Sequence, residues 1–226
     1  MTRAPRMPTK DGASGQAEGA QPARDLAAGT RPLTAARIRN IAEHYVGQRE
    51  SSARMLRNVL ERRLQRRLRS LAPEVAAEER EAVLPLIDAE IARLEAAGVL
   101  QDARYAEMKA RSALSSGRGG RRILQDLARK GIASETAREA LLEAAREVAG
   151  TAEPDLDQFD LLRTAEAEAA DVFARKRRLG PYRTEPLPED RSERSRIWRR
   201  EAAAMTRAGF GLDTIRWVLD RQPEEN

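Results

Sequence analysis

The chain has 226 residues, of which 41% are hydrophobic and 4% aromatic, and 41 Lys and Arg against 36 Asp and Glu give a net charge of +5. A charge this small excludes a protein that packages DNA through charge alone. The absence of cysteine excludes disulfides, thiolate nucleophiles and thiolate metal sites, and it is compatible with a reducing cytoplasm. No run of about twenty apolar residues is present, so we expect no transmembrane helix and no membrane partner.

Composition and periodicity predict an all-α fold. Leu, Ala, Ile and Val supply most apolar residues, and long Arg and Glu side chains surround them, as in amphipathic helices. Windows in which apolar and polar residues alternate with period two are absent. Residues 1–32 are rich in Gly, Ala, Pro and charge, so we expect a disordered N-terminal tail. This tail could bind nucleic acid weakly or serve only as a solubilising segment.

The first helices are predicted by capping residues followed by apolar residues three and four positions apart. Thr34 is the expected cap of the first helix, and Ser51 or Ser52 that of the second. Pro73 precedes a third helix, which we expect to end at Gly98 because glycine readily adopts the left-handed conformation found after helix C-termini.

The middle of the chain repeats this pattern with shorter helices. Asp102 is the expected cap of a helix that closes at residues 115–120, SSGRGG. A short helix follows and stops at Gly131, and Ser134 is the expected cap of the next.

The last section is expected to contain three more helices. The first covers about 156–179, and a long polar loop at 180–193 follows, which we expect to be mobile. A helix around 197–207 then leads through Gly209 to a final helix that includes Val218.

An internal repeat relates these sections. A shift of 78 residues superimposes Gly131 on Gly209, and a shift of 68 residues superimposes Met55 on Ile123. Three units follow, which we expect to stack around a continuous core because short amphipathic helices cannot bury their apolar faces alone. Their ranges are 33–97 for the first unit with the start of the second, 98–150 for the second, and 151–226 for the third with its loop. The residues expected to shape the corners are Gly98, Asp102, Gly131, Ile132, Gly209 and Phe210.

The segment GGRRILQDLARKGI, residues 119–132, has three possible interpretations. A phosphate-binding loop is disfavoured because the glycines precede arginines and Lys130 comes at the end of the apolar pattern. A base-reading helix-turn-helix is disfavoured because the positions after the corner include Glu135, Glu139 and Glu143, which phosphates would repel. The segment is therefore best interpreted as a structural corner of one repeat.

Few residues suit catalysis. The only histidine, His44, lies beside Ile41 on a helical pattern and is expected to be structural. Paired acids such as Glu78 and Glu79 lie in polar segments where solvation is the default. We therefore expect no enzyme activity, no cofactor and no metal.

Basic clusters are the candidate binding residues. Residues 49–70 contain eight arginines and two glutamates, whereas residues 74–95 contain seven acids and two arginines. Alternating blocks of this kind fit a mixed-charge protein partner better than bare DNA, which favours a continuous basic stripe. The candidates are Arg62, Arg63, Arg66 and Arg67 in the first unit, Arg118, Arg121, Arg122 and Lys130 in the second, and Arg175, Lys176, Arg177 and Arg178 in the third.

Four segments in this order resemble the RecX family, regulators of the bacterial recombinase RecA. They are RESSARMLRNVLERRL, AAGVLQDARYAEMKARS, GRGGRRILQDLARKGI and RAGFGLDTIRWVL, and the resemblance covers about residues 34–220. Two departures from the family pattern occur. The last corner has Ala208 where the family has arginine, and the first unit has Arg63-Leu64 where Lys-Gly is expected.

The resemblance implies an all-helical protein of three tandem three-helix repeats, elongated and curved. It implies binding along the groove of the RecA filament on single-stranded DNA, which limits filament growth, ATP hydrolysis, strand exchange and the co-protease activity that triggers the SOS response. We expect a cytoplasmic monomer with weak direct DNA binding. The alternative is a non-specific nucleic-acid-binding helical protein that acts through phosphate contacts and loses affinity steeply with salt.

Overall fold

The computed structural model describes residues 31–150 and 157–221. Within these two ranges the chain forms nine α-helices, one short 3-10 helix and no strand, so the predicted all-α fold is confirmed for this part of the protein. The tail expected at 1–32 lies outside the described residues apart from its last two positions. None of the described helices is both long enough and apolar enough to span a membrane.

The first group consists of α1 (Ala35–Val46), α2 (Ala53–Leu68) and α3 (Pro73–Ala96). Its first two helices begin at side-chain caps, because Thr34 accepts a hydrogen bond from the Arg37 N–H and Ser52 accepts one from the Met55 N–H. The apolar faces of the three helices enclose one core, whose fully buried members include Ile38, Leu56, Leu60, Leu64 and Ile87.

The second and third groups are joined more closely. The second has α4 (Asp102–Ser115), α5 (Gly120–Arg129) and α6 (Ser134–Val148); the third has α7 (Gln158–Arg177), η1 (Gly180–Tyr182), α8 (Arg191–Ala208) and α9 (Leu212–Leu219). Helix α6 packs against α4 and α5 and also against α7, which in turn packs against α9. The two groups therefore share a single core. That the three groups are copies of one repeated unit stays a prediction.

The core is divided in two, which corrects the expectation of a continuous core. One hydrophobic cluster belongs to α1–α3, and a second runs through α4–α9. The junction between them relies largely on polar contacts: the Ser52 hydroxyl donates to the Lys130 carbonyl over 2.6 Å, and the Ala53 N–H donates to Asp102 Oδ1 over 2.9 Å. Met55 of α2 adds an apolar contact to the second core.

Glycines follow the C-termini of α5 and α8 in the left-handed conformation. Gly131 has a φ of 84° and Gly209 a φ of 98°, a region that side chains other than glycine rarely adopt. The next residue in each case, Ile132 or Phe210, is buried, and its N–H donates back to a carbonyl of the preceding helix. Gly98, with a φ of 67°, occupies the equivalent position after α3.

Several predicted boundaries are wrong by one residue or more. The N-cap of α4 is Gln101 rather than Asp102, whose carboxylate instead accepts from the start of α2, and the N-cap of α6 is Ala133 rather than Ser134. Arg63-Leu64 stands where the family pattern has the Lys-Gly of a corner, but no corner occurs there. Helix α2 continues through these residues to Leu68, which is buried like the other leucines on that face of the helix.

The segment 180–193 is also more structured than a polar loop. It contains η1 and the first turn of α8, which starts at Arg191 because the Asp190 side chain accepts from the Glu193 N–H. The mobility expected for this segment stays a prediction.

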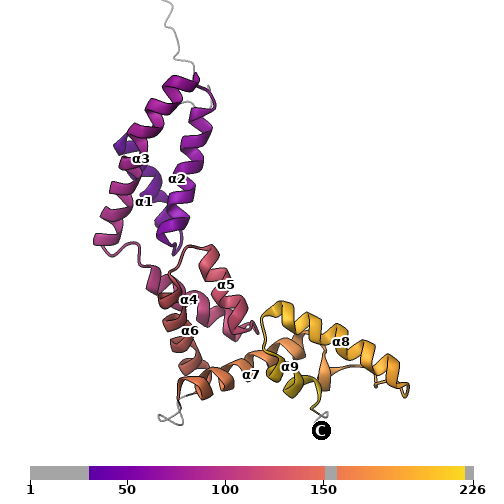
Figure 1. Cartoon of the computed structure of the whole chain (residues 1–226). Helices are drawn as coiled ribbons and strands as arrows, with labels where there is room; N and C mark the ends of the chain where they lie inside the picture. The colour runs from indigo at the N-terminus through magenta and orange to yellow at the C-terminus, as the bar shows by residue number, and fades with distance from the viewer. Residues whose placement is uncertain (1–30, 151–156, 222–226) are drawn as a thin grey trace, which may run out of the picture.

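The molecule is elongated and bent, as Figure 1 shows. The first two groups follow one another along the long axis, and the third group turns aside so that α8 extends away from it. The bend leaves a concave side that is bordered by α2, α5 and α8 (Figure 1).

Candidate partner-binding face

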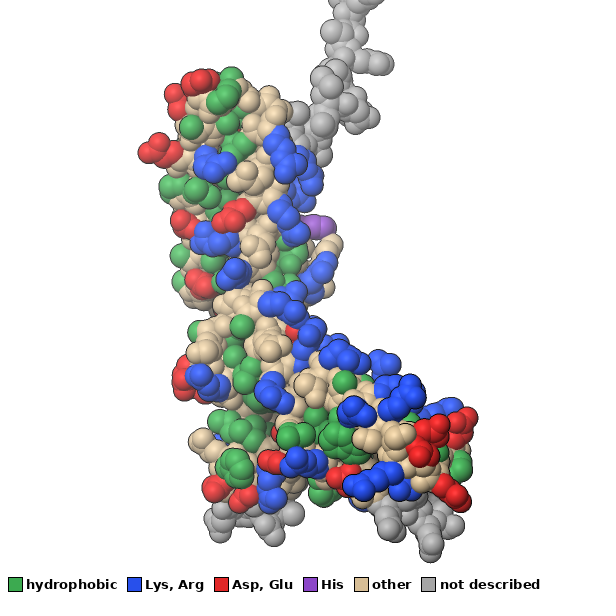
Figure 2. All heavy atoms as spheres, turned by 45° about the vertical axis from the view of Figure 1, so that its right-hand side comes forward, with side chains coloured by type: hydrophobic (Ala, Val, Ile, Leu, Met, Phe, Trp, Pro, Cys, Tyr) green, Lys and Arg blue, Asp and Glu red, His purple; other side chains and the backbone are tan. Residues whose placement is uncertain are grey.

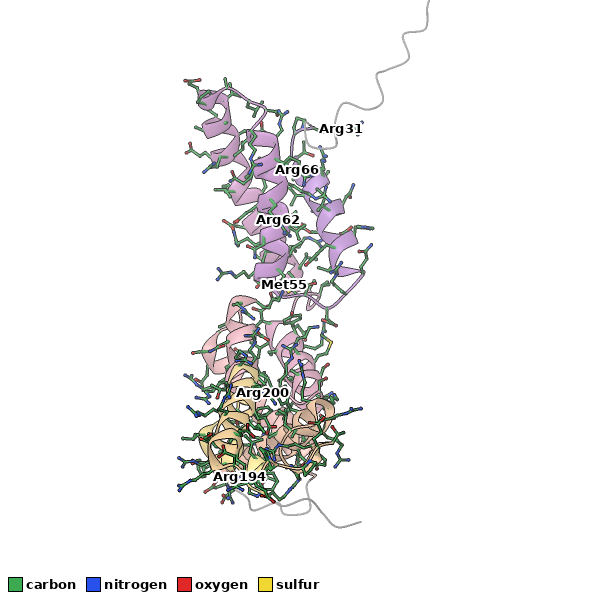
Figure 3. The ribbon with its side chains drawn as sticks, turned by 90° about the vertical axis from the view of Figure 1, so that its right-hand side faces the viewer. Arg31, Met55, Arg62, Arg66, Arg194 and Arg200 are labelled. Carbon is green, nitrogen blue, oxygen red and sulfur yellow. The ribbon has the colours of Figure 1, made fainter. Side chains whose placement is uncertain are left out.

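Basic side chains gather on the concave side of the molecule. Figure 2 shows Lys and Arg side chains along this side, from the first group down to the third. Seen from this side in Figure 3, Arg66, Arg62 and Met55 of α2 lie above Arg200 and Arg194 of α8. We refer to this surface, from Arg66 to Arg194, as the concave face.

The upper part of the concave face is one side of α2. Met55, Arg62 and Arg66 are spaced by seven and four residues, so they project on the side of the helix opposite the buried stripe that begins at Leu56. Arg62 and Arg66 are exposed, and within the described ranges neither forms an ion pair. Their charges are therefore available to a partner.

The other two candidates on α2 lie elsewhere. Arg67 binds Glu79 of α3 through Nε at 3.0 Å, and the two side chains are only 18% and 16% exposed, so this ion pair joins α2 to α3. Arg63 is exposed but lies about 100° around the helix from Arg62. The predicted cluster thus divides into residues available for binding and a residue that supports the fold.

The lower part of the concave face contains a groove of about 630 Å³ between the second and third groups, which we call the basic groove. Its lining includes six cationic side chains from four helices or their ends: Arg118, Arg122, Lys176, Arg177, Arg200 and Arg207. The single carboxylate in the lining belongs to Glu201, which is buried and held by Arg183 at 2.8 Å. The lining of the groove therefore carries a net positive charge.

A contact between two glycines forms this groove. The Gly119 N–H donates to the Ala208 carbonyl over 3.0 Å, and a Cβ on Gly119 would lie 2.3 Å from the carbonyl carbon of Gly209. Only glycine allows the start of α5 to approach the end of α8 this closely. The second and third predicted clusters meet through a different contact: a Cβ on Gly117 would lie 2.8 Å from the backbone nitrogen of Phe173, and the Lys176 ammonium donates to the Ser116 carbonyl.

The cations of the basic groove differ in how strongly the protein already holds them. Arg118 and Arg122 both contact Asp126, at 3.1 and 3.3 Å, and the Lys176 ammonium donates to the Ser116 carbonyl over 3.2 Å. Among the described residues, Arg200 and Arg207 form no ion pair. These two arginines are therefore the members best able to bind an external anion.

Three predicted residues make contacts within the fold or shape the end of a helix. The Arg121 guanidinium donates to the Phe210 carbonyl and ties α5 to the corner before α9. Arg175 contacts Asp171 and lies over the Tyr182 ring, and Arg178 ends α7 with a φ of 55°. Of the four basic residues at 175–178, Lys176 and Arg177 alone line the basic groove.

Sequence reasoning missed the arginines of α8. Residues 191–200, RSERSRIWRR, contain five arginines and one glutamate, and Arg207 follows near the end of the helix. This charge bias was visible in the sequence. Only Arg191 falls in the predicted polar loop, whereas Arg199, Arg200 and Arg207 fall in the helix predicted around 197–207.

A second groove, of about 970 Å³, lies above the basic groove, between α4, α5 and residues 49–55. Met55 and Met108 give it apolar lining, and Lys130, predicted as a binding residue, is at its rim. We call it the methionine groove. It shares Ser116 and Arg118 with the basic groove, so the two are continuous along the concave face.

A separate polar network stabilises the third group. The Tyr182 hydroxyl donates to Asp171 over 2.7 Å, and Arg221 also contacts this carboxylate, at 2.5 Å. Burial alone would raise the pKa of Asp171, but the hydrogen bonds from Tyr182 and Arg221 outweigh it, and the pKa lies below its usual range.

Replacing Asp171 with asparagine should lower the free energy of unfolding at pH 7 by about 1–3 kcal/mol, because three donors, Tyr182, Arg175 and Arg221, lose a charged acceptor. Because the pKa of Asp171 is lower in the folded protein than the unfolded value of about 4, its ionised carboxylate stabilises the fold at any pH above that unfolded value. This contribution is lost as the pH falls through the pKa of the folded protein. The difference from wild type should therefore be complete at pH 7 and shrink below about pH 4. Urea unfolding followed by circular dichroism, at pH 7 and at a pH below about 4, measures this difference in the free energy of unfolding. Glu168→Gln on the same helix is the control, and equal loss in both variants would contradict the assigned role.

These features define a class of protein: an all-helical array of three-helix groups with an extended basic face for binding. Across the described ranges, no group of three or more metal-binding side chains occurs. A family model described as RecX, second three-helix domain, matches residues 102–141, which cover α4, α5 and the first half of α6.

Curated relatives match over most of the chain. Regulatory protein RecX of Myxococcus xanthus is 32% identical over 193 residues, which are 85% of this chain and 89% of that protein. Regulatory protein RecX of Agrobacterium fabrum is 29% identical over 83% of this chain and 84% of its own length. The protein of the same name from Shewanella oneidensis is 28% identical over 58% of this chain and 94% of its own. The chain belongs to the RecX family of regulatory proteins.

Proposed function

We propose that this protein regulates RecA, mainly as an inhibitor, by placing its concave face in the groove of the RecA filament on single-stranded DNA. In this position it limits filament growth and therefore ATP hydrolysis, strand exchange and the SOS co-protease activity. The observation that carries the proposal is the gathering of basic side chains from all three helical groups on one concave face.

The shape and charge of the face support this partner. A stack of helical groups provides a long concave surface that can follow a helical polymer. A filament on DNA offers both protein carboxylates and phosphates. The concave face offers cations that can bind either group, including Arg62, Arg66 and Arg200, which form no ion pair within the described residues.

The proposed action is occupation of the filament groove, without a chemical step by this protein. Such binding resists the addition of further RecA subunits, so each bound molecule affects many subunits. Inhibition should therefore occur at molar ratios well below one molecule per RecA subunit.

A second candidate function is non-specific nucleic-acid binding. The basic groove favours it, because six cations face a single carboxylate that is already held by Arg183. Binding of this kind would be sequence-blind and would weaken steeply with salt.

ATP hydrolysis by RecA on single-stranded DNA, measured while this protein is titrated below the RecA concentration, distinguishes the two functions. The proposal predicts strong inhibition at these ratios, with no ATPase activity from the protein alone. Inhibition only when the protein is abundant enough to coat the DNA would favour the nucleic-acid binder. Repeating the titration at two salt concentrations separates the two further, because simple coating of DNA depends more steeply on salt.

A further inference from the structure

The methionine groove contains apolar surface that a purely ionic interaction does not require. Met108 is 37% exposed, and Met55, which lines the same groove, is partly buried. Beneath them lie Tyr105, Ile123 and Leu127, each 2% exposed. Methionine side chains are flexible and polarisable, so they adapt to apolar side chains of different shape.

The rim of the same groove is basic. It carries two carboxylates, Glu50 and Asp126, and five cations: Arg49, Lys109, Arg118, Arg129 and Lys130. Both carboxylates are already bound, Glu50 by Arg104 at 3.1 Å and Asp126 by Arg118 at 3.1 Å. Within the described part of the chain, Lys109 and Lys130 have no carboxylate partner.

This combination suits a protein segment better than a nucleic acid. Single-stranded DNA would use exposed aromatic rings to stack its bases, but Tyr105, the aromatic residue of the lining, is almost fully buried. An apolar floor with a few charged groups at its edge is typical of sites that take an apolar anchor and fix its orientation with polar contacts. The positive rim selects negative charge beside that anchor.

We propose that the methionine groove docks an acidic segment of a partner protein. A large aliphatic or aromatic side chain of that segment lies between Met55 and Met108, and its neighbouring carboxylates pair with Lys109 and Lys130. This inference rests on the proposed function, in which the partner is RecA. It assigns the methionine groove to protein contact, next to a basic groove suited to phosphates.

Site-specific photo-crosslinking from the methionine groove tests this assignment. Met108 is replaced with p-benzoylphenylalanine, the protein is added to RecA filaments on single-stranded DNA, and the adducts are identified by mass spectrometry after irradiation. We expect an adduct with a RecA peptide that contains more Asp and Glu than Lys and Arg and an apolar residue at the attachment site. Lys109→Glu with Lys130→Glu should reduce its yield about fivefold or more, because the charges then repel the segment.

Two controls separate docking from proximity and from net charge. The same probe at Trp217, which is 49% exposed on α9 and lines neither groove, should give little of this adduct. Arg138→Glu with Arg146→Glu on α6 changes the net charge equally and should leave the yield unchanged.

The outcomes distinguish this inference from the function on which it rests, because ATP hydrolysis is measured on the same samples. Inhibition without an adduct at position 108, or with an adduct to DNA or to a basic RecA peptide, overturns the docking assignment and leaves the proposed function standing. The expected adduct without inhibition supports docking and overturns the proposed function. If neither the adduct nor inhibition is observed, both the docking assignment and the proposed function are overturned.

Discussion

Arg200→Glu combined with Arg207→Glu is expected to raise the concentration needed for half-maximal inhibition of RecA by about 10- to 100-fold, which corresponds to roughly 1.4–2.7 kcal/mol of binding free energy. Both side chains are exposed in the basic groove, and in the described ranges neither has an ion pair. Charge reversal therefore removes two attractions to phosphate or carboxylate and introduces repulsion. The measurement is ATP hydrolysis by RecA on single-stranded DNA across a titration of each variant.

The matched control again lies on α6. Arg138→Glu with Arg146→Glu alters the net charge by the same amount, and both arginines form exposed pairs with acids three residues away, outside the two grooves. We expect this control to inhibit nearly as well as wild type. Equal loss in both variants would show a general charge effect, and full inhibition by the α8 variant would exclude the basic groove as a contact.

A different pair of arginines shows why the structure is needed to choose these variants. The sequence alone indicated Arg121 and Arg122 as candidate binding residues. Arg121, however, donates to the Phe210 carbonyl, and the backbone of Arg122 lies against Gly209. Reversal at these positions would disturb the junction of the second and third groups, so a loss of inhibition would not identify a binding contact.

Gly209→Val is expected to lower the free energy of unfolding by about 3 kcal/mol or more. A valine there must adopt a φ of 98°, which costs on the order of 1–3 kcal/mol. Its Cβ would also lie 2.5 Å from the backbone nitrogen of Arg122, and backbone cannot move aside as the end of a flexible side chain can. Thermal unfolding followed by circular dichroism, with near-ultraviolet signals from the tryptophans, measures the loss.

Gly150→Val separates crowding from conformational strain in that experiment. Gly150 also has a positive φ, of 58°, but no atom of the residues that the structure describes lies within 4 Å of the position of a Cβ. We expect its cost to be limited to the conformational strain and therefore clearly smaller. Equal stability of the two variants would contradict the close packing of α5 against α8.

The local signals in this chain, namely helix periodicity and glycine position, are readable without a structure. Thr34 and Ser52 start helices because a hydroxyl satisfies nearby N–H groups, and this depends only on residues within one turn. The positive φ values at Gly131 and Gly209 likewise follow from what glycine permits and valine does not. Helix starts were less predictable where a short polar side chain had a distant alternative partner, as at Asp102.

The sequence by itself determined the all-helical class, the order of the helices and the presence of several basic clusters, because each depends on residues three or four positions apart. Only the tertiary structure decided which arginines have partners inside the fold and which are exposed without an ion pair in the described residues. Arg67 and Arg121 are used internally, whereas Arg62, Arg66, Arg200 and Arg207 remain exposed on the concave face. The physical reason is that the contacts making this choice, above all Gly119 against Gly209, join residues far apart in the chain and depend on how whole helices pack.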